Sequence, residues 1–223
     1  MEGYNQDKYA ICIGRSFGSG GGEFAKKLSD RLGIPMYDKN ILDKAAEDAN
    51  IRRELFERVD ECNNFSIPMV YGAGFSVPSS FFVYTDNYLS NENLFRMQAE
   101  TIQELARKSS AVFVGRCSDF VLRNHPHLLT IFVSDDQKHR IQRIQERIED
   151  ASDMDEARKM MEKLDKERRE YYNYYTGGHW GRAESYDLTF RSSIIGMDYA
   201  VKHVEELIKH LGFPVNGAHK AQE

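Results

Sequence analysis

Three apolar runs along the chain have the pattern of strands that are buried on both faces of a parallel sheet. They are rich in β-branched residues, and two of them end at a glycine: YAICIG (9–14), AVFVG (111–115) and LLTIFVS (128–134). Strands covered by helices on both sides lack the strict alternation of half-exposed strands. Shorter candidates are IPMYD (34–38) and a segment near 186–190. The pattern therefore predicts a sheet of parallel strands.

Amphipathic segments separate these runs. Apolar residues recur at helical spacing, and Gly33 and Gly177 supply stop signals after two of the segments. The predicted helical segments are 23–32, 39–62 (one or two helices), 91–108, 135–175 (one helix or a pair) and 197–211. Strands that alternate with helices of this length imply crossover connections. The fold class is therefore α/β.

The length favours one domain. A chain of 223 residues with 41% apolar and 29% charged residues resembles an average globular protein, and we expect a single domain over 1–213. Segment 63–90 is rich in Phe, Ser, Gly and Tyr and shows no periodicity, which is typical of an inserted flap or an oligomer contact. Residues 214–223 have the composition of a disordered tail.

Charge and cysteine content narrow the classes of function. The formal net charge is −5, so a global basic field for nucleic acid is lacking. No apolar run approaches the roughly 20 residues that span a bilayer, and the polar start has no signal core, so we expect no membrane association and a cytoplasmic protein. The odd number of cysteines, without CxxC spacing, indicates reduced thiols rather than disulfides or zinc.

The segment GRSFGSGGGE, called the glycine-rich loop below (residues 14–23), joins the first strand to the first helix. Glycines permit positive φ and close approach, and a helix start offers free N–H groups with a partial positive charge, an arrangement that favours phosphate by about 1 kcal/mol or more. The alternative is a flexible turn without a ligand. The predicted phosphate-binding residues are Gly18, Ser19, Gly20, Gly21 and Gly22.

The loop departs from the usual P-loop motif, which carries a lysine and then a Ser or Thr after its last loop glycine. Alignment with the GxxxxGKGT form places Arg15 at the opening glycine, Gly21 at the lysine and Glu23 at the threonine. Arg15 could supply the missing positive charge, since guanidinium binds phosphate oxygens in bidentate fashion. Glu23 could ligate Mg²⁺ or could be a favourable first-turn charge that needs no metal.

The sequence resembles the cytidylate kinase-like family of bacterial proteins, relatives of the cytidylate kinases. The resemblance covers nearly the whole chain and rests on IGRSFGSGGGEFAKKLSDRLGIPMYDKNIL, AVFVGRCSDFVL, LDKERREYYNYYTGGHWG and SYDLTF. It implies a three-layer P-loop kinase fold, with a parallel sheet flanked by helices and a helical lid region at 135–183. It also implies ATP with Mg²⁺ as donor and a nucleoside monophosphate such as CMP as acceptor.

The resemblance also implies roles for individual residues. Arg116 matches an arginine that contacts the acceptor phosphate, and Asp165 and Arg168 match residues that contact the acceptor and the transferred phosphoryl group. Arg140 and Arg143 match arginines at the start of the mobile lid. Asp38 ends the second strand, near the start of the relatives' acceptor-binding segment. Arg15, Arg140, Arg143 and Arg168 are thus the predicted catalytic residues, with Asp38, Arg116 and Asp165 at the acceptor.

Helical spacing suggests an alternative, structural role for the arginines in two of these assignments. Arg168 interrupts an apolar stripe, so it needs either Asp165 or a bound phosphate as partner. Arg140 and Arg143 lie on a polar face, where a solvated charge run is the alternative.

Met161 and Cys117 stand where true cytidylate kinases have an arginine and an aspartate, which leaves the identity of the acceptor open. A nucleotide-binding module without transfer and a small-metabolite kinase are the competing functions.

Overall fold

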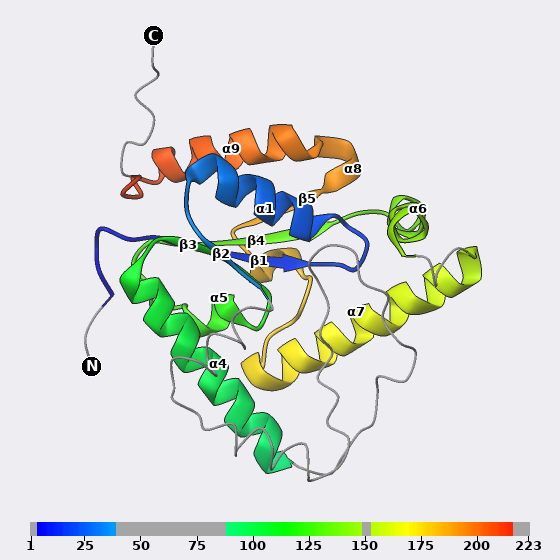
Figure 1. The fold of residues 1–223 in the computed structure, drawn as a ribbon, viewed down its shortest axis with the longest axis horizontal. Coiled ribbons are helices and arrows are strands. Elements are labelled where there is room, and N and C mark those ends of the chain that lie inside the picture. Colours follow the sequence, from blue (N-terminus) through cyan, green and yellow to red (C-terminus); the bar gives the residue numbers. More distant parts are fainter. Residues whose placement is uncertain (1–3, 39–87, 149–152, 216–223) are drawn as a thin grey trace.

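A parallel sheet lies at the centre of the protein. The computed structural model describes residues 4–38, 88–148 and 153–215, and within them five parallel strands form one sheet in the order β2-β3-β1-β4-β5 (Figure 1). The strands are β1 (Ala10–Arg15), β2 (Met36–Tyr37), β3 (Ala111–Val114), β4 (Leu128–Ser134) and β5 (Leu188–Arg191). β1 pairs with β3 on one side and with β4 on the other. All carboxyl ends therefore meet at one edge of the sheet.

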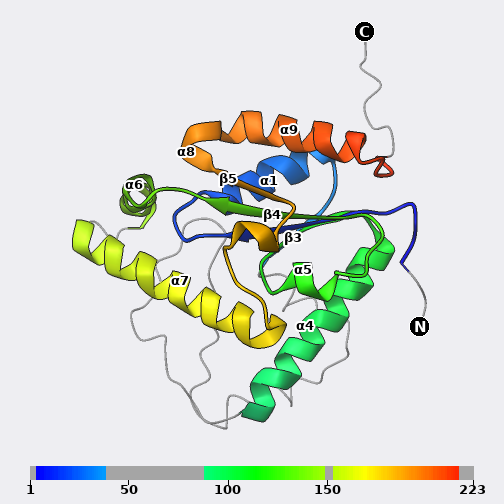
Figure 2. The same ribbon diagram turned by 180° about the vertical axis from the view of Figure 1, so that it is seen from behind.

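Helices cover both faces of the sheet (Figures 1 and 2). On one face lie α1 (Gly21–Leu32) and α9 (Met197–His210), and on the other lie α4 (Tyr88–Lys108) and α5 (Ser118–Val121). Each face of the sheet has its own apolar core, and alternate residues of β1 belong to one or the other. Ile11 and Ile13 pack with the first pair of helices, and Cys12 packs with the second. This burial on both faces explains the continuous apolar runs in the sequence.

A third apolar cluster lies beyond the carboxyl edge, between α6 (Gln137–Arg147) and α7 (Met154–Thr176). Phe17 of the glycine-rich loop is 3% exposed and packs there with Ile141, Ile144 and Met161. The loop is therefore anchored in the core of the predicted lid region.

The structure confirms the predicted α/β class and most element positions. The 135–175 segment is a pair of helices, α6 and α7. α4 begins three residues earlier than predicted, and β5 lies at Leu188–Arg191 after the short helix η2 (Ala183–Ser185). The short helix α8 (Ser192–Ile195) has too few residues to give a periodic signal.

Several predictions fall outside the described residues. They concern the helices of 39–62, the flap or oligomer contact over 63–87 and the tail from 216. The boundary of a single domain over 1–213 likewise stays a prediction. Within the described residues, every helix is too short or too polar to span a bilayer.

Phe17→Ala should destabilise the protein by about 3–5 kcal/mol, because truncation of a buried phenylalanine leaves a cavity between packed helices. Denaturant unfolding measures the loss. Phe120→Ala is the matched control, since Phe120 is only partly buried and stacks on Arg123. Equal small effects for both variants would contradict the anchoring role of Phe17.

Candidate nucleotide-binding site

The glycine-rich loop ends at a helix start that no side chain of the described residues caps with a hydrogen bond. Gly20 is the N-cap residue of α1 with a left-handed φ of 78°, and no side-chain hydrogen bond caps the helix there. The Ser19 side chain turns back within the loop, where its hydroxyl donates to the Ser16 carbonyl at 2.8 Å. An oxyanion can therefore meet the first N–H groups of α1.

Two loop glycines are required by their surroundings. Gly18 has φ of 75°, and a Cβ there would lie 2.7 Å from the carbonyl oxygen of Arg140. A Cβ on Gly20, whose φ is also positive, would overlap the methyl group of Met197 in α9 and would lie 3.3 Å from the Arg143 guanidinium carbon. In contrast, a Cβ on Gly22 would meet nothing within 4 Å among the described residues. Gly18 thus lets α6 approach the loop closely, and Gly20 makes room for the start of α9.

Donors from α6, α7 and α8 bind the carbonyl oxygens of the loop. Arg140 Nε donates to the Phe17 carbonyl at 2.6 Å, and Arg143 Nη1 to the Gly18 carbonyl at 3.1 Å. Arg168 Nη1 donates to the Arg15 carbonyl at 3.2 Å, and Ser192 Oγ to the Ser19 carbonyl at 2.7 Å. The N–H groups of Ser16, Phe17 and Ser19 in turn donate to the Val133 carbonyl, to Asp165 and to the Ser16 carbonyl, so the first N–H groups of α1 are the ones that an anion would meet.

Arg140 and Arg143 therefore contact the loop rather than forming only a solvated charge run. Arg147, one helical turn further on, forms an ion pair of 2.6 Å with Glu23. The three arginines follow helical spacing, so a single face of α6 lines the loop. Two of the three guanidinium groups thus bind loop carbonyl oxygens, and the third pairs with the first turn of α1.

Asp165 acts on the loop backbone in this structure. Its carboxylate accepts the Phe17 N–H at 2.7 Å and forms an ion pair with Arg140, and both side chains are 12% exposed. Arg168, one turn further along α7, lies over the Phe17 ring with its guanidinium carbon 5.4 Å from the centroid. The acceptor role of Asp165 and Arg168 stays a prediction.

Arg15, Asp38 and Arg116 gather at the carboxyl edge of the sheet. Arg15 Nη2 lies 3.7 Å from Asp38 Oδ1, and each side chain is 17% exposed. Burial lowers the pKa of Arg15, the neighbouring Asp38 opposes this, and the positive charge of Arg116 lowers the pKa further. Open α/β sheets bind ligands at this edge.

Arg116 sits in a strained turn. Gly115, Arg116 and Cys117 have successive φ values of 74°, 56° and 53°, and Ser118 N–H closes the turn on the Gly115 carbonyl at 3.1 Å. A residue other than glycine in the left-handed region costs about 1–2 kcal/mol. Strain of this kind concentrates at functional sites, where the surrounding structure holds it in place.

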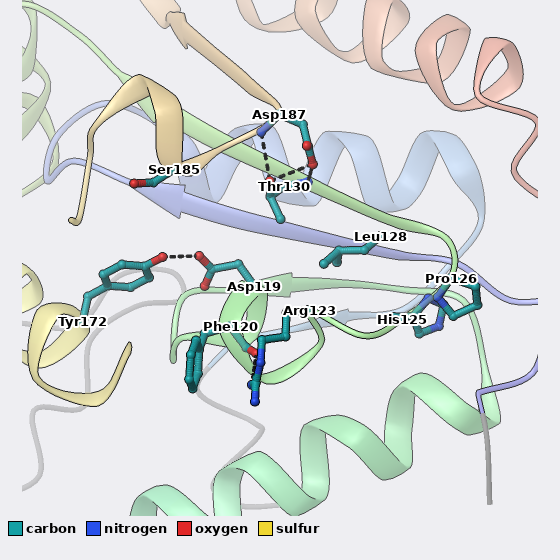
Figure 3. Close-up of a pocket in the computed structure, with 10 residues that line it drawn as sticks. All are labelled: Asp119, Phe120, Arg123, His125, Pro126, Leu128, Thr130, Tyr172, Ser185 and Asp187. Atoms are coloured by element: carbon teal, nitrogen blue, oxygen red, sulfur yellow. Dashed lines mark hydrogen bonds between the residues drawn. The ribbon is translucent and has the colours of Figure 1, made fainter. Parts of the chain in front are cut away.

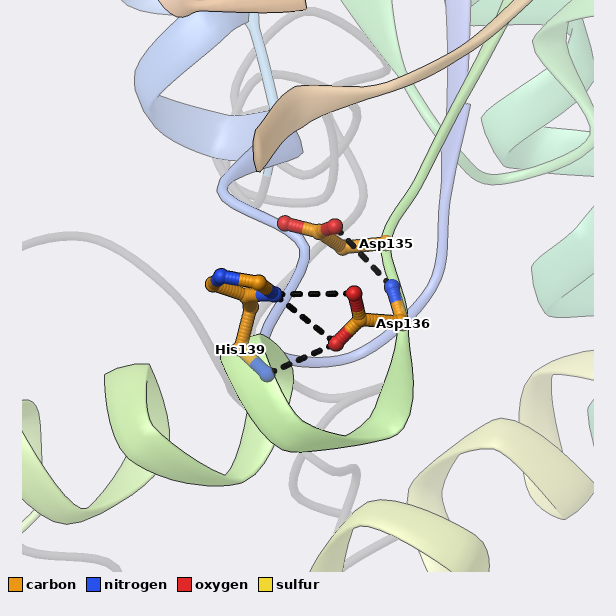
Figure 4. A group of neighbouring side chains, drawn as sticks. All are labelled: Asp135, Asp136 and His139. Carbon is orange, nitrogen blue, oxygen red and sulfur yellow. Dashed lines mark hydrogen bonds and ion pairs between the residues drawn. The ribbon is translucent and has the colours of Figure 1, made fainter. Parts of the chain in front are cut away.

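Glu23, the predicted metal ligand, is already paired with Arg147 and lies 4.0 Å from Lys27. A second acidic group lies at the end of β4, where Asp135, Asp136 and His139 offer ligand atoms within 4.8 Å of one another (Figure 4). Asp136 caps α6 by accepting the His139 N–H at 3.0 Å. Helix capping accounts for this arrangement without an ion.

Asp135 has a structural role that the sequence did not indicate. Its buried carboxylate accepts hydrogen bonds from Ser193 N–H at 3.1 Å and from the Ser193 hydroxyl, and it lies 2.7 Å from Ser192 Oγ, whose single hydrogen it shares with the Ser19 carbonyl. Burial raises the pKa of Asp135, but the bonds from Ser193, Ser192 and Asp136 N–H outweigh it, so the pKa is lowered overall. The carboxylate thereby positions Ser192 beside the Ser19 carbonyl.

The tyrosines at the end of α7 have packing partners. Tyr171 donates to Gln98 at 3.2 Å, Tyr172 donates to Asp119 at 2.7 Å, and the Tyr175 ring stacks on Phe95 with centroids 4.1 Å apart. These contacts fit the packing interpretation of the tyrosine cluster rather than base stacking.

A pocket of about 420 Å³ opens beside α5, and none of its lining residues belongs to the predicted site (Figure 3). Tyr172 and Asp119 meet at one end of it, and Thr130 and Asp187 bond to each other in its wall. Burial raises the pKa of Asp119, although the hydrogen bond from Tyr172 opposes this. The polar side chains in each of these two pairs are thus already hydrogen-bonded to each other.

A parallel sheet whose first strand leads through a glycine-rich loop into a helix, with helices on both faces, defines the three-layer P-loop kinase fold. A shikimate kinase from Bacteroides thetaiotaomicron shares it, with a TM-score of 0.50 and 13% identity over 90% of this chain and 98% of its own. An uncharacterized protein from Eubacterium ventriosum ATCC 27560 has a TM-score of 0.67 and 27% identity over 91% of this chain and 99% of its own.

The chain belongs to the cytidylate kinase-like family, whose sequence profile matches residues 10–194. The match contains the glycine-rich loop, the Arg116 turn and both helices of the predicted lid region. No curated protein matches the sequence. The chain is therefore a P-loop kinase relative, and the residues of its site must be judged from their geometry.

Asp165→Asn should lower the free energy of unfolding by roughly 1–3 kcal/mol, because Arg140 loses its charged partner in a mostly buried position. Urea denaturation measures the change. Glu162→Gln, on the exposed side of α7, is the control and should stay within about 0.5 kcal/mol of the wild type. Equal free energies of unfolding for the two variants would show that Asp165 does not stabilise the loop.

Proposed function

We propose that the protein is an ATP-dependent kinase that moves the γ-phosphoryl group of ATP to a nucleoside monophosphate such as CMP. The observation that carries this proposal is the uncapped start of α1, approached by Arg140 and Arg143. Family membership and the kinase fold support phosphoryl transfer as the chemistry. We infer the identity of the acceptor from the family resemblance and from Arg116 and Arg168, the two arginines that are proposed to bind its phosphate.

On the side of the phosphate donor ATP, N–H groups of residues 18–22 bind the β-phosphate. Side chains that donate hydrogen bonds to the loop carbonyl groups hold the loop in place. Arg15, Arg140 and Arg143 neutralise the γ-phosphoryl group. Phosphoryl transfer needs little covalent help from the protein, because positioning and positive charge lower most of the barrier. The charged groups near the loop are suited to that task.

On the acceptor side, Arg116 and Arg168 bind the monophosphate, with Asp38 and Asp165 as further acceptor contacts. An oxygen of the acceptor phosphate forms the new bond to the γ-phosphorus while the bond to the bridging oxygen of ADP breaks. The acceptor phosphate is already ionised near neutral pH, so the step needs no strong general base. Both arginines belong to the carboxyl edge, where the two substrates must meet.

Mg²⁺ fits this site through Glu23, the one predicted carboxylate ligand beside the loop. Mg²⁺ commonly keeps several waters and binds one or two carboxylates together with substrate phosphates. When bound, it neutralises phosphate charge. Glu23 would exchange part of its contact with Arg147 for that ion.

A kinase that consumes ATP works where ATP is made, so we place the reaction in the cytoplasm. Nucleotides are the proposed partners, and segment 63–90 is the proposed contact between copies of the chain.

Two other functions use the same fold. The missing P-loop lysine favours a module that binds nucleotide without transfer. A small-metabolite kinase is the third candidate, as the shikimate kinase in the comparison is by name. An ADP-release assay across nucleoside monophosphates and common metabolites, shikimate included, separates these functions. Tight ATP binding without turnover on any acceptor would favour the module.

Arg116→Ala and Arg168→Ala should each lower kcat/KM for CMP by about a hundredfold, because each removes a charged ligand of a phosphate group in the transition state. Steady-state kinetics with CMP measure the loss. Arg158→Ala is the control, as an exposed arginine at the other end of α7. Normal turnover in the first two variants would refute their assignment to the site.

A further inference from the structure

Residues 15 and 21 compete for the same space. A Cβ atom built on Gly21 would overlap the Cβ of Arg15, and it would lie 3.0 Å from Arg15 Cγ and 3.4 Å from Val133 Cβ. Strand β1 and the framework around Val133 are buried, so neither backbone can move aside cheaply. A side chain at position 15 and a side chain at position 21 therefore exclude each other.

The usual motif resolves this competition in the opposite way. It has glycine at the position of Arg15 and lysine at the position of Gly21. In this chain both residues are changed together: the side chain that the motif places at 21 is absent, and a longer cation begins at 15. The two departures from the motif are thus one exchange, rather than one loss and one unrelated replacement.

The guanidinium of Arg15 extends along the carboxyl edge of the sheet. A Cβ on Gly115, just after β3, would lie 3.2 Å from the Arg15 guanidinium carbon, so the group rests against bare backbone there. Asp38, just after β2, lies with its carboxylate 3.7 Å from Arg15 Nη2. The cation therefore lies between the loop that would hold the donor and the Arg116 turn that would hold the acceptor.

We propose that Arg15 is the functional replacement of the P-loop lysine, and that it binds the terminal phosphoryl group of ATP from the acceptor side of the loop. This inference rests on the proposed kinase function and assigns the charge that its loop motif lacks. Arg15 is mostly buried beside the Asp38 carboxylate and a second arginine. A phosphate anion that enters the site would neutralise this buried positive charge. A guanidinium can also bind two oxygens of the phosphate at once.

Binding measurements test the position of the charge without requiring turnover. Isothermal titration calorimetry compares ATP with ADP, each with Mg²⁺, for the wild type, Arg15→Gln and Arg15→Lys. Arg15→Gln should weaken ATP by about tenfold more than ADP, because a charge-assisted bond to the terminal phosphoryl is lost. Arg15→Lys should keep most of the preference for ATP. A merely structural role would weaken both nucleotides equally, and that result would overturn the inference.

Reciprocal exchange tests the steric coupling. Arg15→Gly should lower kcat by about a hundredfold through the loss of charge. Gly21→Lys alone should lower both kcat and the unfolding temperature, because its side chain collides with Arg15. The double variant Arg15→Gly/Gly21→Lys restores the usual motif and should recover to within about tenfold of the wild-type kcat. Arg31→Gln, on the exposed end of α1, is the control for loss of a cation.

The outcomes separate this inference from the proposed function. A wild type that binds ATP but phosphorylates no acceptor defeats the kinase proposal, whereas the comparison of ATP with ADP still decides the role of Arg15. Full turnover in Arg15→Gln, or a double variant no better than Arg15→Gly, defeats the inference and leaves the kinase proposal standing. A wild type that binds neither nucleotide defeats both.

Discussion

Hydrogen bonding to the carbonyl side of the glycine-rich loop is the interaction on which the rest of the site depends. Arg168, Arg140, Arg143 and Ser192 bind the carbonyl oxygens of residues 15, 17, 18 and 19, and Ser19 binds that of residue 16. A flexible glycine-rich segment has many accessible conformations, and each donor removes some of them. The conformation of the loop is thereby fixed before any ligand arrives, which is the preorganisation that anion binding needs.

The same contacts join the loop to the predicted lid region. Phe17 lies inside the apolar cluster of α6 and α7, and Asp165 binds both the loop N–H and an α6 arginine. A displacement of α6 would therefore release Arg140 and Arg143 from the loop together. The conformation of the loop and the position of α6 are consequently coupled through named bonds, rather than through simple proximity.

Local pattern was sufficient for much of this architecture. Doubly buried strands give continuous apolar runs, so β1, β3 and β4 were predictable, as was the uncapped loop that follows β1. Contacts between residues far apart in sequence were not predictable. Asp135 and Ser192 are separated by 57 positions, and only the pairing of β4 with β5 brings them together. The exchange between Arg15 and Gly21 likewise needs the angle at which β1 enters the loop.

If Arg116 binds the acceptor phosphate, as proposed, the left-handed turn at Arg116 and Cys117 is a compromise between stability and activity. Selection for stability alone would favour Asn-Gly here, since those residues adopt positive φ at little cost. Such a replacement would relax the backbone and remove the guanidinium from the carboxyl edge. A thermostabilisation campaign guided only by backbone conformation would therefore choose this turn early, and under the role proposed for Arg116 it would lose activity as the melting temperature rises.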